Sequence, residues 1–174
     1  SVFNEYNVRK AVIESIDSNA LLALSGGGKV MNCSYTQGAG GYLDESVLPG
    51  IAYNPDDAKA LLADSKYNGQ TIEFHALTTD ENYATAIAQY MQAVGFKVNI
   101  SLEDSASFAT TRANGTYDMF YVGVGTFDGD ELNQYLTPRI LNDCHCSHYV
   151  NEDMNALIKK ADATTDSAAR YKIL

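Results

Sequence analysis

The middle of the chain alternates between two periodicities, and this alternation constrains the fold more than any other feature. Residues 70–77 and 96–102 carry apolar side chains at every second position, as half-buried strands do. Residues 81–94 and 105–113 are predicted helices, and 117–124 is an almost continuous apolar strand, typical of burial on both faces. Strand, helix, strand, helix and strand at this spacing predict a βαβαβ unit with a parallel sheet and right-handed crossovers.

Capping residues mark the ends of the predicted helices. Asp80 and Asp104 stand where N-caps are expected, and Gly95 stands where a helix would end. Pro55 takes the first position of an earlier helix, with Asn54 as its cap. Further helices are predicted at residues 5–16, at 18–25 with Ser18 as the cap, and at about 151–163.

Size and charge limit the classes of function. A chain of 174 residues can build one full hydrophobic core, and 45% hydrophobic residues exclude wholesale disorder. The net charge of −10 argues against nucleic acid or an anionic membrane as a partner, because both require a basic face. The motifs of serine hydrolases, zinc proteases, P-loop proteins and dinucleotide-binding enzymes are missing, so we expect no enzyme and no cofactor.

The segment that leaves the third predicted strand is the candidate ligand site. Ligands of open α/β sheets bind at the carboxyl ends of the strands. Glycines let the backbone approach a ligand, Phe127 offers an apolar wall, and Asp128 and Asp130 offer anionic anchors. The alternative is a Gly-Asp turn whose carboxylates face water and cap the next helix. The candidate ligand-binding residues are Val124, Gly125, Thr126, Phe127, Asp128 and Asp130.

A cluster of cysteine and histidine residues lies further on, at Cys144, His145, Cys146 and His148. The spacing of these residues differs from the spacing of the ligand pairs in structural zinc sites, so we predict no high-affinity metal site there. Cys144 and Cys146 are too close in sequence to form a disulfide without strain. A disulfide between Cys33 and either of them is left open by the sequence. His75 lies in a predicted strand and is expected to be a hydrogen-bonded structural histidine.

Five fragments in a fixed order carry a resemblance to a known family. They are Asn7-Val8-Arg9-Lys10-Ala11-Val12, Tyr53-Asn54-Pro55-Asp56-Asp57-Ala58-Lys59-Ala60-Leu61-Leu62, Tyr90-Met91-Gln92-Ala93-Val94-Gly95-Phe96-Lys97-Val98, Gly115-Thr116-Tyr117-Asp118-Met119 and Asn151-Glu152-Asp153-Met154-Asn155-Ala156-Leu157-Ile158-Lys159-Lys160-Ala161. Together they resemble the C-terminal lobe of the family 5 extracellular solute-binding proteins, which capture dipeptides, oligopeptides or nickel for ABC importers. The resemblance extends from about Asn4 to Leu174.

The resemblance implies a fold and a function. The fold would be a three-layer α/β lobe of the type II periplasmic-binding-protein kind, with a mostly parallel sheet and helices on both faces. Residues 1–174 would form a single domain, the C-terminal lobe of a longer two-lobe protein. That protein would capture peptides outside the cytoplasmic membrane and deliver them to ABC permease subunits. Nickel, another small solute, or a role as a peptide-sensing receptor are the alternatives. Membrane attachment would depend on a lipoprotein anchor outside this chain, on the periplasmic or extracellular side.

The resemblance also implies roles for the candidate loop. In the family this loop usually reads Gly-Trp, then polar residues and Asp-Pro, and it faces the cleft between the lobes. In peptide binders its aspartate pairs with the free amino group of the ligand. Gly123 matches the family glycine, and Asp128 or Asp130 matches the aspartate, whereas Val124 replaces the tryptophan and Glu131 replaces the proline. Nickel-binding members have a histidine in roughly the stretch 144–148.

Overall fold

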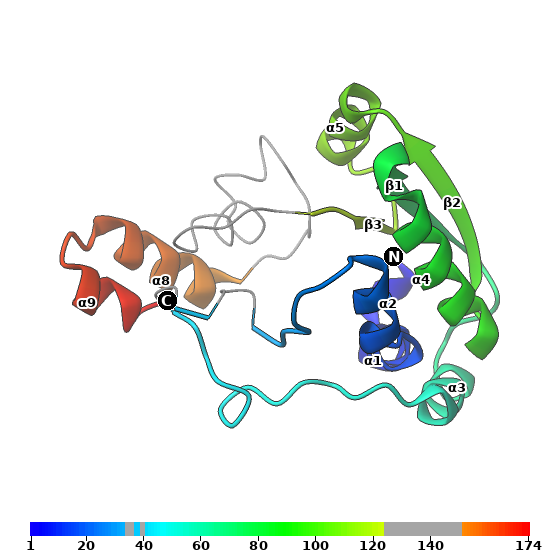
Figure 1. Cartoon of the computed structure of the whole chain (residues 1–174), viewed down its shortest axis with the longest axis horizontal. Coiled ribbons are helices and arrows are strands. Elements are labelled where there is room, and N and C mark those ends of the chain that lie inside the picture. Colours follow the sequence, from blue (N-terminus) through cyan, green and yellow to red (C-terminus); the bar gives the residue numbers. More distant parts are fainter. Residues whose placement is uncertain (34–36, 39–40, 124–150) are drawn as a thin grey trace. The chain divides into compact units, whose positions relative to one another are not determined.

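The computed structural model describes residues 1–33, 37–38, 41–123 and 151–174 (Figure 1). The chain divides into two compact units. Unit 1 consists of Ser1–Val30, Ile51–Phe108 and Thr116–Val122, and unit 2 of Met31–Gly50, Ala109–Gly115 and Gly123–Leu174. The candidate loop 124–130 and the cluster at 144–148 lie outside the described residues.

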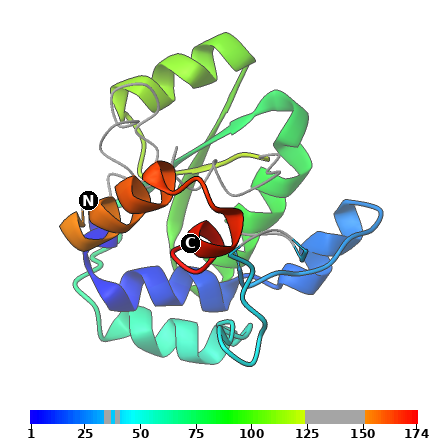
Figure 2. The same ribbon diagram turned by 90° about the vertical axis from the view of Figure 1, so that its left-hand side faces the viewer.

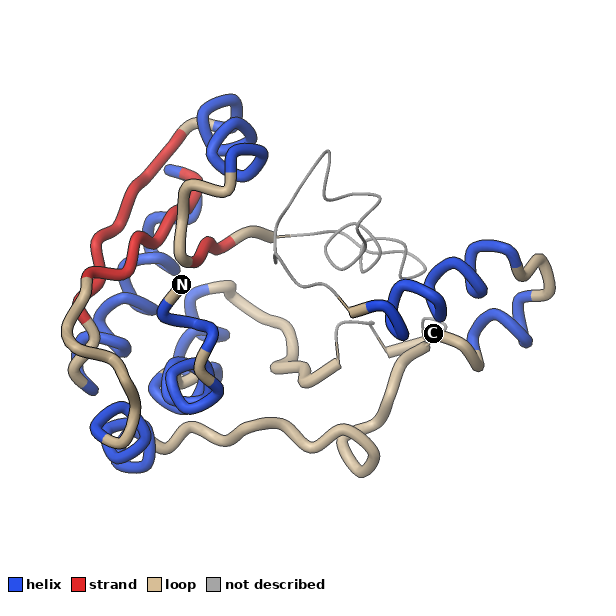
Figure 3. The backbone as a smooth tube through the Cα atoms, turned by 180° about the vertical axis from the view of Figure 1, so that it is seen from behind, coloured by secondary structure: helices blue, strands red, loops and turns tan. Residues whose placement is uncertain are grey.

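Unit 1 contains a three-stranded sheet in the order β2-β1-β3. Its strands are β1 (Thr71–Leu77), β2 (Lys97–Glu103) and β3 (Met119–Tyr121), shown as red tubes in Figure 3. Both pairings are parallel, and Phe74 of the central strand is in register with Ile100 on one side and Met119 on the other. The predicted parallel βαβαβ unit is confirmed, because α4 (Glu81–Val94) joins β1 to β2 and α5 (Ser105–Asn114) joins β2 to β3.

One face of the sheet holds the core of unit 1. Ile72, Phe74 and Ala76 alternate along β1 and are fully buried. The helices that supply the other buried side chains are α1 (Tyr6–Ser15), α3 (Pro55–Ala63) and α4. Helices α1 and α3 lie side by side (Figure 2). On the opposite face, the ring of Phe108 packs edge-on against Phe120 of β3, with ring centroids 6.0 Å apart. The sheet is therefore flanked by helices on both faces.

The helix caps follow the sequence except at α2 (Ser18–Leu24) and at α4, where Asp80 occupies the N-cap position without a capping hydrogen bond. Asn54 accepts a hydrogen bond from the backbone N–H of Asp57, and Asp104 accepts from the N–H groups of Ala106 and Ser107, as predicted. The predicted cap of α2 was wrong. Asp17 caps this helix through its Oδ1, which accepts from the N–H groups of Asn19 and Ala20, and Ser18 is already helical.

Two predictions about the strands differ from the structure. Leu102 was expected inside and is 38% exposed, because β2 pairs with β1 alone among the described strands and so lies at an edge of the described sheet. The third strand is shorter than the predicted 117–124, and its three residues are half-buried. Its attachment to β1 begins one residue earlier, where the N–H of Asp118 donates to the carbonyl of Glu73.

Unit 2 contains α8 (Glu152–Ala163) and α9 (Ser167–Tyr171) in its described part. Asn151 caps α8 by accepting from the N–H of Met154, which confirms the predicted helix start. Ile158 and Ala161 are buried, whereas Leu157 is 47% exposed. Elsewhere in this unit Asn32 lies against Gly50, where an added Cβ atom would collide with the Asn32 side chain. No helix in the described part of the chain has the length and apolarity to cross a bilayer.

Candidate functional site

All three strands end at the same edge of the sheet because they run parallel. The register pairs Leu77 with Glu103 and Ala76 with Tyr121, so the last residues of the three strands lie close together. The segment Thr78–Asp80 forms a short 3-10 turn that connects this edge to α4. Ligands of parallel α/β sheets bind outside the carboxyl ends of the strands, which makes this edge the first candidate for a binding site.

A histidine and a glutamate join β1 and β2 at this edge. The Nδ1 atom of His75 contacts the Oε1 atom of Glu103, and the two side chains are 13% and 15% exposed. The hydroxyl of Thr78 donates to the backbone carbonyl of Glu103 at 3.1 Å. His75 therefore has its hydrogen-bond partner inside the sheet, as the sequence predicted, and this pair fixes the relative positions of the two strand ends.

Two tyrosines stack beside the end of β3. The rings of Tyr83, in the first turn of α4, and Tyr121 are 5.3 Å apart between centroids and inclined by 15°. Burial raises the pKa of Tyr121 above its ordinary value of 10.0, and the nearby Tyr83 and Asp80 raise it further. Asp80 stands at the N-cap position of α4, yet its carboxylate makes no capping hydrogen bond. The edge thus combines two phenols with a carboxylate.

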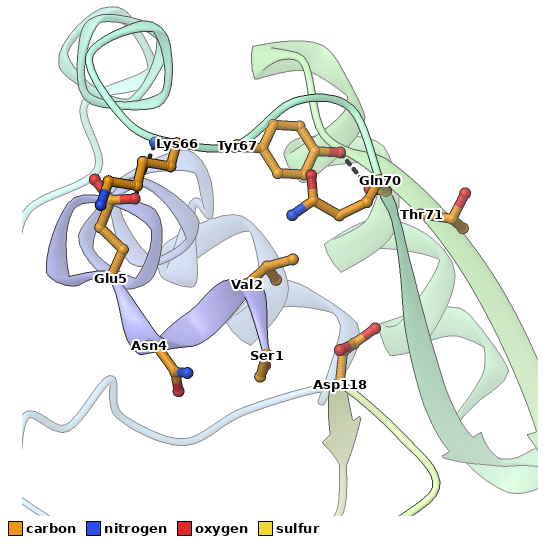
Figure 4. A pocket seen from close by; sticks show the side chains of 9 residues that line it. All are labelled: Ser1, Val2, Asn4, Glu5, Lys66, Tyr67, Gln70, Thr71 and Asp118. Carbon is orange, nitrogen blue, oxygen red and sulfur yellow. Dashed lines mark hydrogen bonds between the residues drawn. The ribbon is translucent and has the colours of Figure 1, made fainter.

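A hollow of about 750 Å³ lies at the opposite edge of the sheet (Figure 4). Thr71, the first residue of β1, and Asp118, just before β3, both line it. Asp118 accepts a hydrogen bond from the N–H of Glu73 at 3.0 Å, and the hydroxyl of Tyr67 donates to the carbonyl of Gln70 at 2.8 Å. These polar groups hold the backbone at the amino ends of the strands. We therefore place the candidate site at the carboxyl edge and regard this hollow as structural.

The predicted site residues Val124, Gly125, Thr126, Phe127, Asp128 and Asp130 lie outside the described residues. The chain reaches them through Val122 and exposed Gly123, directly after Tyr121 at the carboxyl edge. The possible metal ligands Cys144, His145, Cys146 and His148 also lie outside the described residues, and so do both cysteines with which Cys33 could pair. In the described ranges no three His, Cys, Asp or Glu residues are grouped so that they could hold a metal ion.

Sequence reasoning missed Asp80, Tyr83 and Tyr121 as site residues. Asp80 was interpreted only as a helix cap, and Tyr121 only as part of an apolar strand. The available signal was Asp80, which follows the predicted strand 70–77 and precedes a predicted helix, because a side chain there lies at the ligand-binding edge. Tyr121 gave no such signal, since it lies in the middle of the predicted strand 117–124. Its stacking on Tyr83 depends on how α4 packs, and local periodicity does not predict this.

Comparison with known proteins gives one family and a consistent fold. Residues 1–139 match the family model described as bacterial extracellular solute-binding proteins, family 5 middle. Among solved structures, PBP AgaA from A. tumefaciens R10 in complex with agropinic acid is 28% identical, with a TM-score of 0.82 over 99% of this chain and 37% of that chain. HbpA2 from Haemophilus parasuis is 24% identical, with a TM-score of 0.89 over 99% and 36% of the two chains.

A third solved structure is that of a binding protein in complex with a peptide. The ABC transporter-associated periplasmic binding protein DppA from Helicobacter pylori, in complex with the peptide STSA, is 19% identical, with a TM-score of 0.84. The match covers 99% of this chain and 35% of that protein. The present chain therefore spans little more than a third of the length of these three structures.

Proposed function

Because the chain belongs to the family 5 bacterial extracellular solute-binding proteins, we propose that it is one lobe of the substrate-binding component of an ABC importer. The observation that carries this proposal is the family match over residues 1–139. The protein would capture a peptide outside the cytoplasmic membrane and deliver it to permease subunits. It would act by binding and not by catalysis, in line with the family and with the binding proteins that share the fold.

Capture would depend on contacts made by two lobes. A ligand stabilises the closed form of a two-lobe protein when it makes contacts there that the open form lacks. In this chain the contacts would come from the carboxyl edge of the sheet and from residues 124–130, which follow β3. Asp128 or Asp130 would anchor the free amino group of a peptide. The resemblance in sequence supports this anchor, together with the position of Gly123 shortly after β3, beyond Val122.

Calorimetric titration of the full-length protein tests the proposal. Wild-type protein should bind di- or oligopeptides with a free N-terminus, and Asp128→Ala or Asp130→Ala should weaken that binding by about 2–5 kcal/mol, the range for breaking a buried charge pair. The same substitutions should weaken the binding of N-acetylated peptides much less. Asp56→Asn, on a carboxylate that is 94% exposed, is the matched control. Normal binding by both variants would refute the anchor, and no binding by the wild type would refute peptide capture.

A small solute other than a peptide is the second candidate. It is favoured by AgaA, which is 28% identical and whose structure holds agropinic acid. Titration with agropinic acid beside the peptides separates the two candidates. Nickel is the remaining alternative, because His145 and His148 lie in the stretch where nickel-binding members have a histidine. About one equivalent of nickel that survives dialysis against a chelator would favour it.

A further inference from the structure

The carboxylate of Asp80 is left without a partner at the carboxyl edge. Within the described ranges it makes no capping hydrogen bond and no ion pair. An aspartate at an N-cap position usually accepts from the N–H groups of the first turn, as Asp104 does for α5. Asp80 is half-buried, so its charge is only partly solvated. An anion placed in this way is available to a cation from outside the chain.

The two tyrosines beside Asp80 are held in fixed positions. Tyr83 and Tyr121 stack almost in parallel, and Tyr121 also packs against the core cluster of unit 1. Asp80 stands at the N-cap position of α4 and Tyr83 in its first turn, so the carboxylate and the stacked phenols lie at the same end of this helix. The effect of the Asp80 charge on the pKa of Tyr121 agrees with this placement. No hydrogen bond joins these three side chains, so their oxygen atoms retain free acceptor capacity within the described structure.

This set of groups matches one ligand chemistry. An ammonium group carries three donors and a positive charge, and it is bound by a carboxylate together with hydroxyl oxygens or aromatic faces. An anionic ligand group would be repelled by Asp80, and a purely apolar group would leave the carboxylate unpaired at a desolvation cost. The cluster therefore selects for a cation.

We propose that Asp80, Tyr83 and Tyr121 form a subsite for an ammonium group of the captured solute, separate from the anchor suggested at Asp128 or Asp130. This inference rests on the proposed function, because the subsite operates only if the carboxyl edge faces a ligand. Because the N-terminal amino group of a peptide is assigned to Asp128 or Asp130, the ammonium group at this subsite would come from a lysine side chain, and the N-acetylated peptide tests the N-terminus as the other source. The two sources share the same chemistry at the subsite.

The test uses the full-length protein and matched peptides. Asp80→Asn removes the charge and keeps a good N-cap residue, and Tyr121→Phe and Tyr83→Phe remove only the hydroxyls and keep the stacked rings. Tyr6→Phe, on a side chain that is 61% exposed, and Asp56→Asn are the controls. The ligands are a lysine-containing peptide that the wild type binds, the same peptide with norleucine for lysine, and its N-acetylated form.

Asp80→Asn should weaken binding of the lysine-containing peptide about 5- to 50-fold, a loss between those of exposed and of buried charge pairs. Each Tyr→Phe change should weaken this binding by a smaller factor. For the peptide that lacks the recognised amine, Asp80→Asn should weaken binding less than about twofold. Comparison of the norleucine and N-acetylated peptides therefore identifies which amine the subsite binds. An unchanged affinity, or an equal loss for all three peptides, would overturn the subsite while peptide capture stands. A wild type that binds no peptide or other solute would overturn the proposed function and the subsite with it.

Discussion

The Nζ atom of Lys10 in α1 lies 3.0 Å from the Oδ2 atom of Asp57 in α3, so an ion pair joins two helices that are distant in sequence. The same nitrogen lies 3.0 Å from the Oε1 atom of Glu14, one turn further along α1. The Glu14 side chain is only 8% exposed, and its second oxygen is buried without a hydrogen-bond partner. One cation therefore serves two carboxylates, one of which has little access to water.

Lys10→Met should lower the melting temperature of the protein. The variant keeps an unbranched side chain but leaves the buried Glu14 carboxylate without its cation, and an unpaired buried charge is strongly destabilising. Lys59→Met is the control, because its partner Asp56 is 94% exposed and such pairs contribute little. Thermal unfolding followed by circular dichroism at neutral pH measures both. Equal melting temperatures for the two variants would show that the Lys10 cluster is not stabilising.

The same cluster predicts how stability depends on pH. The hydrogen bond that Lys10 donates to Asp57 holds the pKa of this carboxyl below its ordinary value of 3.8. Its contribution to stability is therefore present above pH 3.8 and is lost as the pH falls through the lower pKa of the folded state. Asp57 and Glu14 raise the pKa of Lys10 above 10.5, so that contribution is complete below 10.5 and is lost as the pH rises further.

Asp57→Asn should therefore reduce the loss of stability at acid pH. Part of that loss should remain, because hydrogen bonds from Ser107 and Ala106 lower the pKa of a second carboxyl, Asp104. Lys10→Met should flatten the alkaline limb. Urea unfolding at a series of pH values provides the curve. An acid limb that is unchanged in Asp57→Asn would contradict the assignment.

Tyr121 should titrate later than an ordinary tyrosine. Burial raises its pKa above 10.0, and the charge of Asp80 adds to this effect, so Asp80→Asn should lower the pKa part of the way back. The difference in tyrosinate absorbance between wild type and Tyr121→Phe isolates this one phenol. An identical difference curve in the Asp80→Asn background would place the carboxylate too far away to act, and it would also weaken the case for the ammonium subsite.

Ile72→Val tests the core beneath the sheet. Ile72 is fully buried, so the loss of one methylene should destabilise the fold by about 0.5–1.5 kcal/mol. Ile13→Val removes the same group from a side chain that is 48% exposed and should change stability by less than about 0.5 kcal/mol. Chemical denaturation of both variants gives the comparison. Equal losses would mean that the buried face of β1 is not the centre of the core.

The features that the sequence predicted well are local ones. Apolar side chains at every second position placed β1, and the order Asn54-Pro55 placed the start of α3, because strand periodicity and helix capping depend on residues only a few positions apart. Asp17 was missed as the cap of α2 because Ser18 is an equally good cap by residue type. Only the backbone geometry distinguishes these two neighbours.

The features that the sequence did not predict come from packing between distant segments. The contact of His75 with Glu103 depends on the register of β1 and β2, and the stack of Tyr83 on Tyr121 depends on how α4 lies against the sheet. Neither relationship leaves a periodic trace in one sequence. The candidate residues 124–130 stay a prediction, because they lie outside the described residues.

The contact between Asn32 and Gly50 has a consequence for engineering. Asn32 and Gly50 lie against each other, so the segment between them begins and ends at nearly the same point. Residues inserted into this segment do not change the distance between its two ends. Loop-closure entropy rises slowly with length, by about 0.6 kcal/mol for each doubling. An affinity tag or a fluorescent reporter placed within residues 33–49 would therefore disturb folding little.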